Sequence, residues 1–353
     1  MTLAQLWLVI DVVFWVGFFV LEGFDFGVGF LHPFISRNDV ERRICINSIG
    51  PVWDGNEVWL IVAGAVIFAA FPLWYATMFS TFYLALVVVL LALIVRGVSF
   101  EYGRKVDDPR WHSSFRWGLA IGSALIPLLV GVALGDLLHG LPINADHQYT
   151  GNFFGLLTPF GLMSGVTMLV LSALMGATYL TLKTTGELHR RAASLSVWCG
   201  WISVAVVWGF MTWAHVGLGR GFVPNPVQVV AILAVIGAAW FAGTGSEGWA
   251  FAMAAVGMAS TVATFFVEMY PHVMVSTTST ANSLTWANAA SPSYTLRVMT
   301  VVAVICFPVV LAYQTWTYVV FRRRLGGPRL DGEDVEPAAP SAPAASTTAV
   351  EQS

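Results

Sequence analysis

The stretch VLEGFDFGVGFLHPF, residues 20–34, places two acids in an apolar setting. Glu22 and Asp25 lie three residues apart, and Asp11 precedes them in the same apolar run. At about 100° per residue, Asp11 and Glu22 are roughly 20° apart around a helix, and Glu22 and Asp25 about 60°. The three carboxyls therefore share one face. An acid at the centre of a membrane helix costs roughly 2.5–3.5 kcal/mol, so this face needs a protein or water neighbour.

A second pair of acids follows in GPVWDGNEVWL, residues 50–60. Asp54 and Glu57 are again three residues apart, so they share a helical face. If one helix crosses the membrane and the next returns, this pair lies at a depth similar to that of Glu22 and Asp25. Four acids without an equal number of bases should not all be ionised, because like charges and desolvation both oppose the charged form.

Two interpretations of the four acids stay open on this basis. In the first, they cap helix starts, accept backbone N–H groups, or pair with Arg96 and a loop arginine. In the second, several carboxyls form a path that carries protons from the cytoplasm. The nearby Gly23, Gly27 and Gly29 favour close helix contact at the same level, so an interior location is expected.

The elements that position these acids are predicted to be membrane helices. Hydrophobic residues make up 57% of the chain and charged residues only 10%, against about 25% charged in soluble domains. The net charge of −3 argues against a nucleic-acid partner. Runs of about 20 apolar residues cross about 30 Å of hydrocarbon. Nine such runs are predicted: 7–31, 52–71, 75–96, 117–139, 155–182, 195–217, 227–243, 245–268 and 295–320.

Basic residues predict the orientation of these spans. They gather in the first, third and fifth connections and after the last span, whereas the opposite connections offer only Arg220. By the positive-inside rule the N-terminus is outside and the C-terminus cytoplasmic. The predicted fold is an all-α polytopic membrane protein of about nine transmembrane helices, arranged as two four-helix bundles plus one peripheral helix. Residues 1–325 form a single transmembrane domain, and the Ala-, Pro- and Ser-rich segment 326–353 a disordered cytoplasmic tail.

Histidine and cysteine give little support for a redox centre in this chain. Three widely spaced cysteines exclude a disulfide framework or a cysteine-ligated cluster. Three histidines near the predicted outer ends of spans lack the spacing of a metal site: His139, His215 and His272. No mid-helix His or Met pair is typical of a haem clamp. Asp136 and Glu268 are interpreted as solvated helix ends.

The residues now point to a family. The segment EGFDFGVGFLHPFISRNDVERRICINSIGPVWDGNEVWLIVAGAVIFAAFP, 22–72, closely resembles subunit II of the cytochrome bd-type quinol oxidases. Four later stretches resemble the same family in the same order: VRGVSFEYG (95–103), YTGNFFGLLTPFGLMSGV (149–166), GATYL with KTTGEL (176–188), and STTSTANSLTWANAASPSYTLRVMT (276–300). The resemblance covers nearly the whole chain apart from the tail.

The resemblance implies a multi-pass subunit of a bacterial cell-membrane complex that reduces O2 to water with electrons from quinol. Subunit I, the partner in an obligate heterodimer, carries two b-type haems and a d-type haem. Subunit II usually binds no haem, so no cofactor and no complete catalytic site are expected in this chain. Membrane lipid contacts are expected. Menaquinol or ubiquinol as donor, a structural quinone and small single-helix accessory subunits stay open.

The resemblance also assigns roles to residues of this chain. Asp25 and Asp54 match family positions associated with a proton route along the subunit interface and with haem assembly in the partner. Glu22 matches an acid, and Glu57 a position that holds Glu or Gln. Three further residues match the family pattern and are expected to order the site: Trp53, Asn56 and Arg96. No metal site is expected.

Two other functions compete with this interpretation. A proton-coupled secondary transporter would also have many spans with internal acids, but it predicts a self-sufficient chain with a substrate cavity. A purely structural subunit predicts that the acids can be neutralised without kinetic loss once assembly is controlled.

Overall fold

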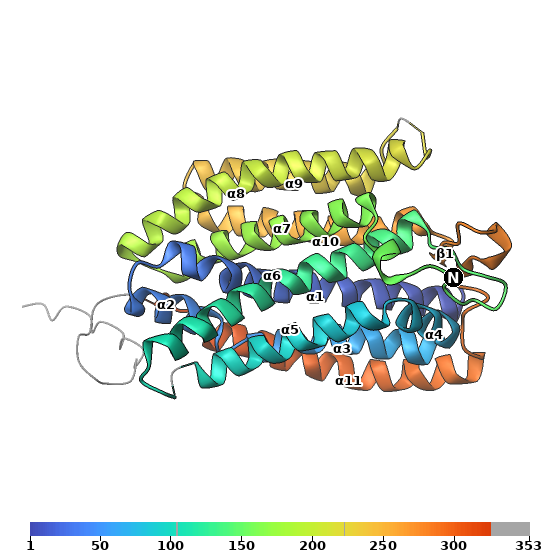
Figure 1. Ribbon diagram of the computed structural model, residues 1–353, viewed down its shortest axis with the longest axis horizontal. Coiled ribbons are helices and arrows are strands. Elements are labelled where there is room, and N and C mark those ends of the chain that lie inside the picture. The colour runs from blue at the N-terminus through green and yellow to red at the C-terminus, as the bar shows by residue number, and fades with distance from the viewer. Residues whose placement is uncertain (104, 222, 326–353) are drawn as a thin grey trace, which may run out of the picture.

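The fold is given by a computed structural model that describes residues 1–103, 105–221 and 223–325. It is an elongated bundle whose long helices run roughly side by side (Figure 1). Within the described residues, nine helices are long and apolar enough to cross a membrane, which confirms the predicted number. The predicted tail, 326–353, lies outside the described residues, and the single domain over 1–325 stays a prediction.

The spanning helices follow the predicted apolar runs along the chain. They are α1 (Leu3–Ile35), α3 (Trp53–Ala70), α5 (Tyr83–Tyr102), α6 (Pro109–His139), α7 (Pro159–Lys183), α8 (Gly186–Thr212), α9 (Pro226–Gly243), α10 (Glu247–Met269) and α11 (Ser293–Val320). Shorter elements connect or extend them: α2 (Asp39–Ile49), α4 (Pro72–Thr81), η1 (Phe153–Leu156), the π-helical η2 (Trp213–Gly217), η3 (Thr280–Asn282), and the antiparallel strands β1 (His272–Met274) and β2 (Leu284–Thr285).

The third predicted span differs most from the structure. The sequence predicts one helix over 75–96, but the chain forms α4 and then α5, with a break at Phe82. Pro72 begins α4, where its missing N–H is not needed. The spanning helix therefore begins later and extends further, to Tyr102. The continuous apolar character of this segment hides the break.

Helix α1 lies at the centre of the packing. It contacts α3 and α6 on one side and α7 and α10 on the other. Helix α6 packs between α5 and α7, α8 packs against α7 and α9, and α9 packs against α10. Helix α11 lies along the edge of the bundle against α1 and α3. Only 6% of the residues in its most apolar 18-residue stretch are buried. Two four-helix bundles plus one peripheral helix remain a prediction.

Small residues bring the backbones of α1 and α7 into contact. A Cβ atom at Gly27 would overlap the Ser172 carbonyl and the backbone of Gly176, and one at Gly176 would overlap Gly27. This agrees with the close helix contact expected from the glycine spacing in the first helix. At about 100° per residue Gly27 lies roughly opposite Glu22 and Asp25, so this contact packs the other side of α1 against α7.

We expect Gly176→Ala to destabilise the fold by about 1–3 kcal/mol, because one added methyl group must separate two packed backbones. Thermal unfolding in detergent measures the effect. Gly248→Ala is the matched control, because a Cβ atom there meets nothing within 4 Å. A melting temperature of Gly176→Ala equal to that of the control would contradict the close contact.

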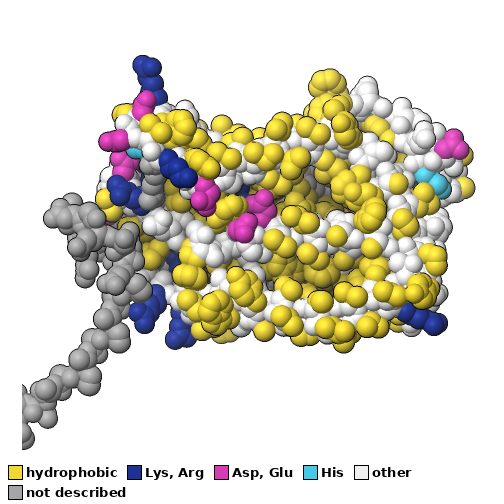
Figure 2. All heavy atoms as spheres, turned by 90° about the horizontal axis from the view of Figure 1, so that it is seen from below, with side chains coloured by type: hydrophobic (Ala, Val, Ile, Leu, Met, Phe, Trp, Pro, Cys, Tyr) yellow, Lys and Arg dark blue, Asp and Glu magenta, His cyan; other side chains and the backbone are white. Residues whose placement is uncertain are grey.

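The two ends of the bundle differ in charge. The α2 end also contains the C-terminal end of α1, and the opposite β1 end contains the N-terminus (Figure 1). The α2 end carries the basic residues Arg37, Arg42, Arg43, Lys105, Arg110, Arg116, Lys183, Arg190, Arg191, Arg322, Arg323 and Arg324. The β1 end carries Arg220 and Arg297. Figure 2 shows the same asymmetry on the face that contains α11, where basic side chains gather mainly at one end.

One ion pair ties α2 to α8 at the basic end. The Arg191 guanidinium donates to the Glu41 carboxylate and to the Ile35 carbonyl at the end of α1. The Arg191 hydrogen bond holds the pKa of Glu41 below its usual range. The connection between α1 and α2 is therefore held against the start of α8.

Candidate functional site

Three carboxyl groups and one guanidinium meet inside the bundle. The Arg96 side chain, fully buried on α5, forms an ion pair with the buried Glu22 of α1. Its Nη1 donates to Glu57 Oε2 of α3 over 2.8 Å. Asp25 is also fully buried, and its carboxyl interacts electrostatically with that of Glu22. We call Glu22, Asp25, Glu57 and Arg96 the acid cluster.

Asn56 fixes the position of Asp25 in the acid cluster. Its Nδ2 donates to Asp25 Oδ2 over 2.7 Å and to the Leu21 carbonyl over 3.0 Å. Its Oδ1 accepts from Gln314 Nε2 at 2.7 Å and from Tyr318 Oη at 2.8 Å, both on α11. The buried amide thus uses both its donors and its acceptor. Asn56 joins α1, α3 and α11 at one point.

Aromatic rings enclose the guanidinium of Arg96. Its Cζ lies 5.0 Å from the centroid of Phe26, 5.4 Å from that of Phe100 and 5.7 Å from that of Trp53. Trp53 and Phe100 stack on each other with centroids 4.7 Å apart. Such rings attract a cation while they keep water away from it. The three residues expected to order the site, Trp53, Asn56 and Arg96, all lie at the acid cluster.

The structure brings three of the four predicted proton-path acids together and leaves the fourth at the surface. Glu57 is partly exposed, with a side-chain exposure of 20%. Asp54 is exposed in the first turn of α3 and lies within electrostatic range of Glu57. The acids therefore run from the interior, at Glu22 and Asp25, through Glu57 to the surface at Asp54. Acidic side chains are visible in the mostly apolar face of Figure 2.

Asp11 shares the buried face of α1 but lies apart from the acid cluster. Its side chain is fully buried, as predicted from its helical position. It precedes Glu22 by three helical turns, which correspond to about 16 Å along the axis. Neither of its carboxyl oxygens has a hydrogen-bond partner among the described residues.

Two acids near the β1 end are not the solvated helix ends that the sequence predicts. Asp136 is fully buried and accepts a hydrogen bond of 2.6 Å from Thr158 Oγ1. Glu268 is 4% exposed; it pairs with His215 Nδ1 and with Arg220 Nη1, each at 3.2 Å. The prediction is wrong because connecting segments fold over both helix ends. The position of a residue in a helix does not show whether a connecting segment buries it.

We expect Glu268→Gln to loosen the segment that contains Arg220, because the buried carboxylate that holds Arg220 and His215 is lost. The expected destabilisation is about 1–3 kcal/mol, as for a buried polar group left without its partner. Tryptic cleavage after Arg220 should become faster, and thermal unfolding should begin earlier. Glu247→Gln is the control, because Glu247 pairs with His189 and Arg324 near the surface. Unchanged cleavage in Glu268→Gln would contradict this role.

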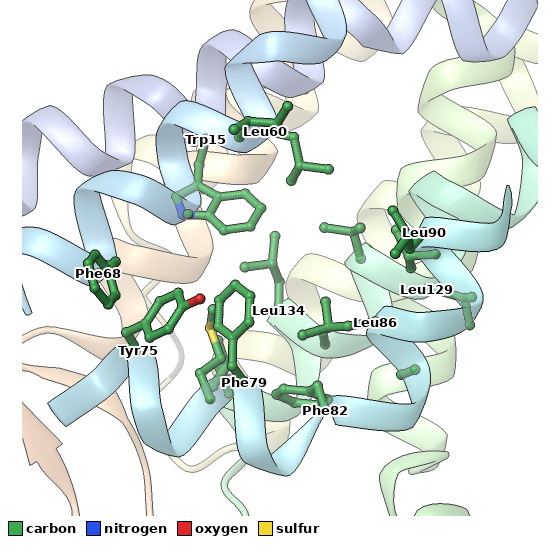
Figure 3. A pocket seen from close by; sticks show the side chains of 18 of the residues that line it. Trp15, Leu60, Phe68, Tyr75, Phe79, Phe82, Leu86, Leu90, Leu129 and Leu134 are labelled. Atoms are coloured by element: carbon green, nitrogen blue, oxygen red, sulfur yellow. The ribbon is translucent and has the colours of Figure 1, made fainter. Parts of the chain in front are cut away.

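An apolar pocket lies between α1, α3, α4, α5 and α6, away from the charged groups. Its volume is about 600 Å³. Trp15 and Tyr75 face it together with Phe79, Leu86 and Leu129 (Figure 3). Among the described residues, no group of three His, Cys, Asp or Glu side chains could hold a metal ion. The pocket suits a hydrocarbon chain and offers no polar substrate site.

The chemistry available at the acid cluster is proton binding and transfer. Two neighbouring buried carboxyls repel each other when both are ionised, so the Glu22–Asp25 pair favours binding a proton beside the Arg96 charge. Glu57 and Asp54 continue this group of carboxyls to the surface. The sequence interpretation missed Gln314 and Tyr318. Their spacing of four residues on one span placed two polar groups on one face and was the signal available.

These features define an integral membrane protein with a buried cluster of carboxyl groups around one arginine. A family model described as cytochrome bd terminal oxidase subunit II matches residues 3–321. Cytochrome bd ubiquinol oxidase subunit 2 of Bacillus subtilis (strain 168) is 40% identical over 330 residues, 92% of this chain and 97% of the relative. Cytochrome bd-I ubiquinol oxidase subunit 2 of Escherichia coli (strain K12) is 40% identical over 355 residues, 88% and 92% of the two chains.

A solved structure shows the same fold. A chain of the bd oxidase from Geobacillus thermodenitrificans matches with a TM-score of 0.63 at 16% identity, over 91% of this chain and 99% of the other. The chain belongs to the cytochrome bd terminal oxidase subunit II family. It is thus a subunit of a respiratory oxidoreductase of the bacterial cell membrane, which confirms the resemblance stated from its sequence motifs.

Proposed function

We propose that this chain is a haem-free subunit II that pairs with subunit I and conducts protons to the oxygen-reduction site in that partner. The observation that carries the proposal is the buried acid cluster, in which carboxyl groups continue to the surface at Asp54. A purely structural subunit has no need for three acids around one buried arginine, because burying charge is costly. A transporter would be a self-sufficient chain, whereas the family to which this chain belongs is described as subunit II of an oxidase.

Few of the side chains of this chain that could ligate haem iron line its apolar pocket, which favours haem sites in the partner. A b-type haem takes axial ligands such as His or Met. The apolar pocket of Figure 3 is lined by no histidine and by one methionine, Met78. The two buried histidines, His32 and His215, do not line that pocket. These residues do not fit a haem, so we assign the two b-type haems and the d-type haem to subunit I.

The face formed by α3, α5 and α11 is proposed as the surface that meets subunit I. Helix α11 is barely buried, and exposed apolar side chains continue over α3 and α5, among them Ile61, Phe68 and Leu91. Asp54 lies exposed in the same region. An acid at a membrane helix needs a protein or water neighbour. A partner on this face would supply that neighbour and would receive the protons.

The orientation of the chain follows from its charge asymmetry. We place the α2 end in the cytoplasm because most basic residues lie there, as the positive-inside rule requires. The N-terminus is then outside. On this orientation the acid cluster opens toward the cytoplasmic half of the membrane. Protons would be drawn from the cytoplasm, while quinol, as menaquinol or ubiquinol, supplies the electrons to the complex.

The apolar pocket is proposed as the place of a structural quinone tail or a lipid chain. Its walls are hydrocarbon and aromatic rings, which match an isoprenoid or acyl chain. We assign it no part in electron transfer.

Purification through an affinity tag tests the pairing and the haem assignment. We expect a larger partner to copurify, together with a reduced-minus-oxidised spectrum that shows b-type haem and the red band of a d-type haem. After the two chains are separated, the haem should stay with the partner. A colourless, folded chain purified alone would reject the pairing and favour the transporter. Carboxamide variants at Asp25 and Asp54, assayed for oxygen consumption at known haem content, test the proton path.

A further inference from the structure

We propose that protons reach the acid cluster from a polar pocket at the α2 end, and that His32 is the relay between this pocket and the cluster. The inference rests on the proposed proton path and names where that path begins. It places the entrance inside this chain, on the side of α1 that faces α6. Three observations carry it: the pocket, the free nitrogen of His32, and the buried hydroxyl of Ser123.

The pocket lies between the end of α1, α2, the end of α5 and the start of α6. Its volume is about 550 Å³, enough for many water molecules. Charged side chains of both signs line it: Asp39, Arg42, Arg43, Glu101, Asp107 and Arg116. Such a lining favours water and protons over a hydrophobic ligand. The pocket is therefore a polar space at the proposed cytoplasmic end of the bundle.

His32 presents one free nitrogen at the inner wall of this pocket. Its side chain is fully buried, and its Nδ1 lies 2.7 Å from the Gly29 carbonyl. Because the carbonyl oxygen is an acceptor, Nδ1 carries the proton and Nε2 keeps a lone pair. Nε2 has no hydrogen-bond partner among the described residues. A buried imidazole with a free nitrogen beside a polar pocket is suited to take up a proton.

His32 also lies on the acid-bearing face of α1. It follows Asp25 by seven residues, which is about 20° short of two full turns and about 10 Å along the helix. Between them, Gly29 brings α6 close, because a Cβ atom at Gly29 would collide with the Ser123 hydroxyl. Ser123 is fully buried and its Oγ has no partner among the described residues. His32 and Ser123 thus meet at the same glycine.

The inner wall of the pocket reaches the acid cluster on a second side. Phe100 lines the pocket, and its ring centroid lies 5.4 Å from the guanidinium carbon of Arg96. On α6, a Cβ atom at Gly122, next to Ser123, would lie 3.4 Å from Arg96 Cβ. The pocket and the acid cluster are therefore separated by a single layer of side chains.

The proposed step moves one proton and changes no other bond. His32 Nε2 takes a proton from hydronium in the pocket, which leaves water behind, and becomes imidazolium. It then releases that proton through the Ser123 hydroxyl and intervening water to the Glu22–Asp25 pair. The imidazole returns to its neutral form, with Nδ1 still donating to Gly29.

Chemical rescue tests the relay in the intact complex. We expect His32→Ala to lower quinol-driven oxygen consumption about tenfold or more at unchanged haem content, because the proton carrier is lost. Added imidazole should restore the rate severalfold, since the pocket offers space beside residue 32. Pyrrole, of the same shape but without a basic nitrogen, should restore nothing. His139→Ala is the control, because that histidine stacks on Phe160 at the other end of α6.

A second pair of variants keeps the test decisive if His32→Ala assembles poorly. His32→Asn offers an amide N–H for the Gly29 carbonyl but carries no proton; it should assemble normally and stay slow. Ser123→Ala should slow turnover more than Ser203→Ala, a matched serine on α8. If Asp25→Asn slows oxygen consumption but His32→Asn does not, the relay through His32 is wrong and the proposed path through the acid cluster stands. If both variants consume oxygen at the unmodified rate, the proposed path is wrong as well. If His32→Ala is slow and imidazole does not restore its rate, His32 has a structural role only.

Discussion

Replacement of Asp25 and Asp54 together by Asn is expected to lower oxygen consumption by about tenfold or more, with the haems of the complex fully loaded. Asn has the shape of Asp, so Asn56 keeps a neighbour at position 25, but the carboxamide binds no proton. The path would then lack both its interior and its surface carboxyl. The measurement is quinol-driven oxygen consumption per haem in purified complex, with the haem content read from the reduced-minus-oxidised spectrum.

Asp136→Asn serves as the control for this double substitution. Asp136 is equally buried but lies at the β1 end, bound to Thr158 and outside the acid cluster. We expect its oxygen consumption to stay close to that of the unmodified complex. If the complex with both substitutions has its full haem content and consumes oxygen at the unmodified rate, Asp25 and Asp54 have a structural role only.

Arg96→Leu is expected to have the largest effect on stability. The guanidinium holds Glu22 and Glu57, and both acids would lose their partner. Removal of one member of a buried ion pair costs about 3–5 kcal/mol, because the other charge stays buried without compensation. We expect little assembled complex and a clearly lower melting temperature for what remains. Thermal unfolding followed by tryptophan fluorescence measures it.

Two further variants separate charge from packing at Arg96. Arg96→Leu with Glu22→Gln removes one charge of each sign and should recover part of the lost stability. Arg190→Gln breaks an exposed pair with Glu187 on α8 and should cost less than about 1 kcal/mol. If Arg96→Leu unfolds at the same temperature as Arg190→Gln, the acid cluster does not depend on its arginine.

The acid-bearing face of α1 could be predicted from the sequence because helical geometry is local. Spacings of 3 and 11 residues place Asp11, Glu22 and Asp25 on one side, and all three are fully buried in the structure. The motif resemblance extended this to Asn56 and Arg96, which also lie at the acid cluster. Periodicity predicts a face; it does not show which side chain meets it from another helix.

The contacts that the sequence did not reveal come from segments distant along the chain. Gln314 and Tyr318 reach Asn56 across 258 and 262 residues. The covers of Asp136 and Glu268 come from Thr158 and Arg220, which are 22 and 48 residues away. Depth in the membrane can be predicted from hydropathy, but the fold of a connecting segment over a helix end cannot. For this reason two buried acids were interpreted as solvated.

Proton uptake by the reduced complex on mixing with oxygen tests the central claim most directly. A pH-sensitive dye follows the uptake while absorbance follows the oxidation of the haems in the same sample. The acid cluster predicts that Asp25→Asn slows proton uptake about tenfold or more, although oxygen still binds and the haem content is unchanged. Uptake at the unmodified rate and with the unmodified number of protons would contradict a proton path through this subunit.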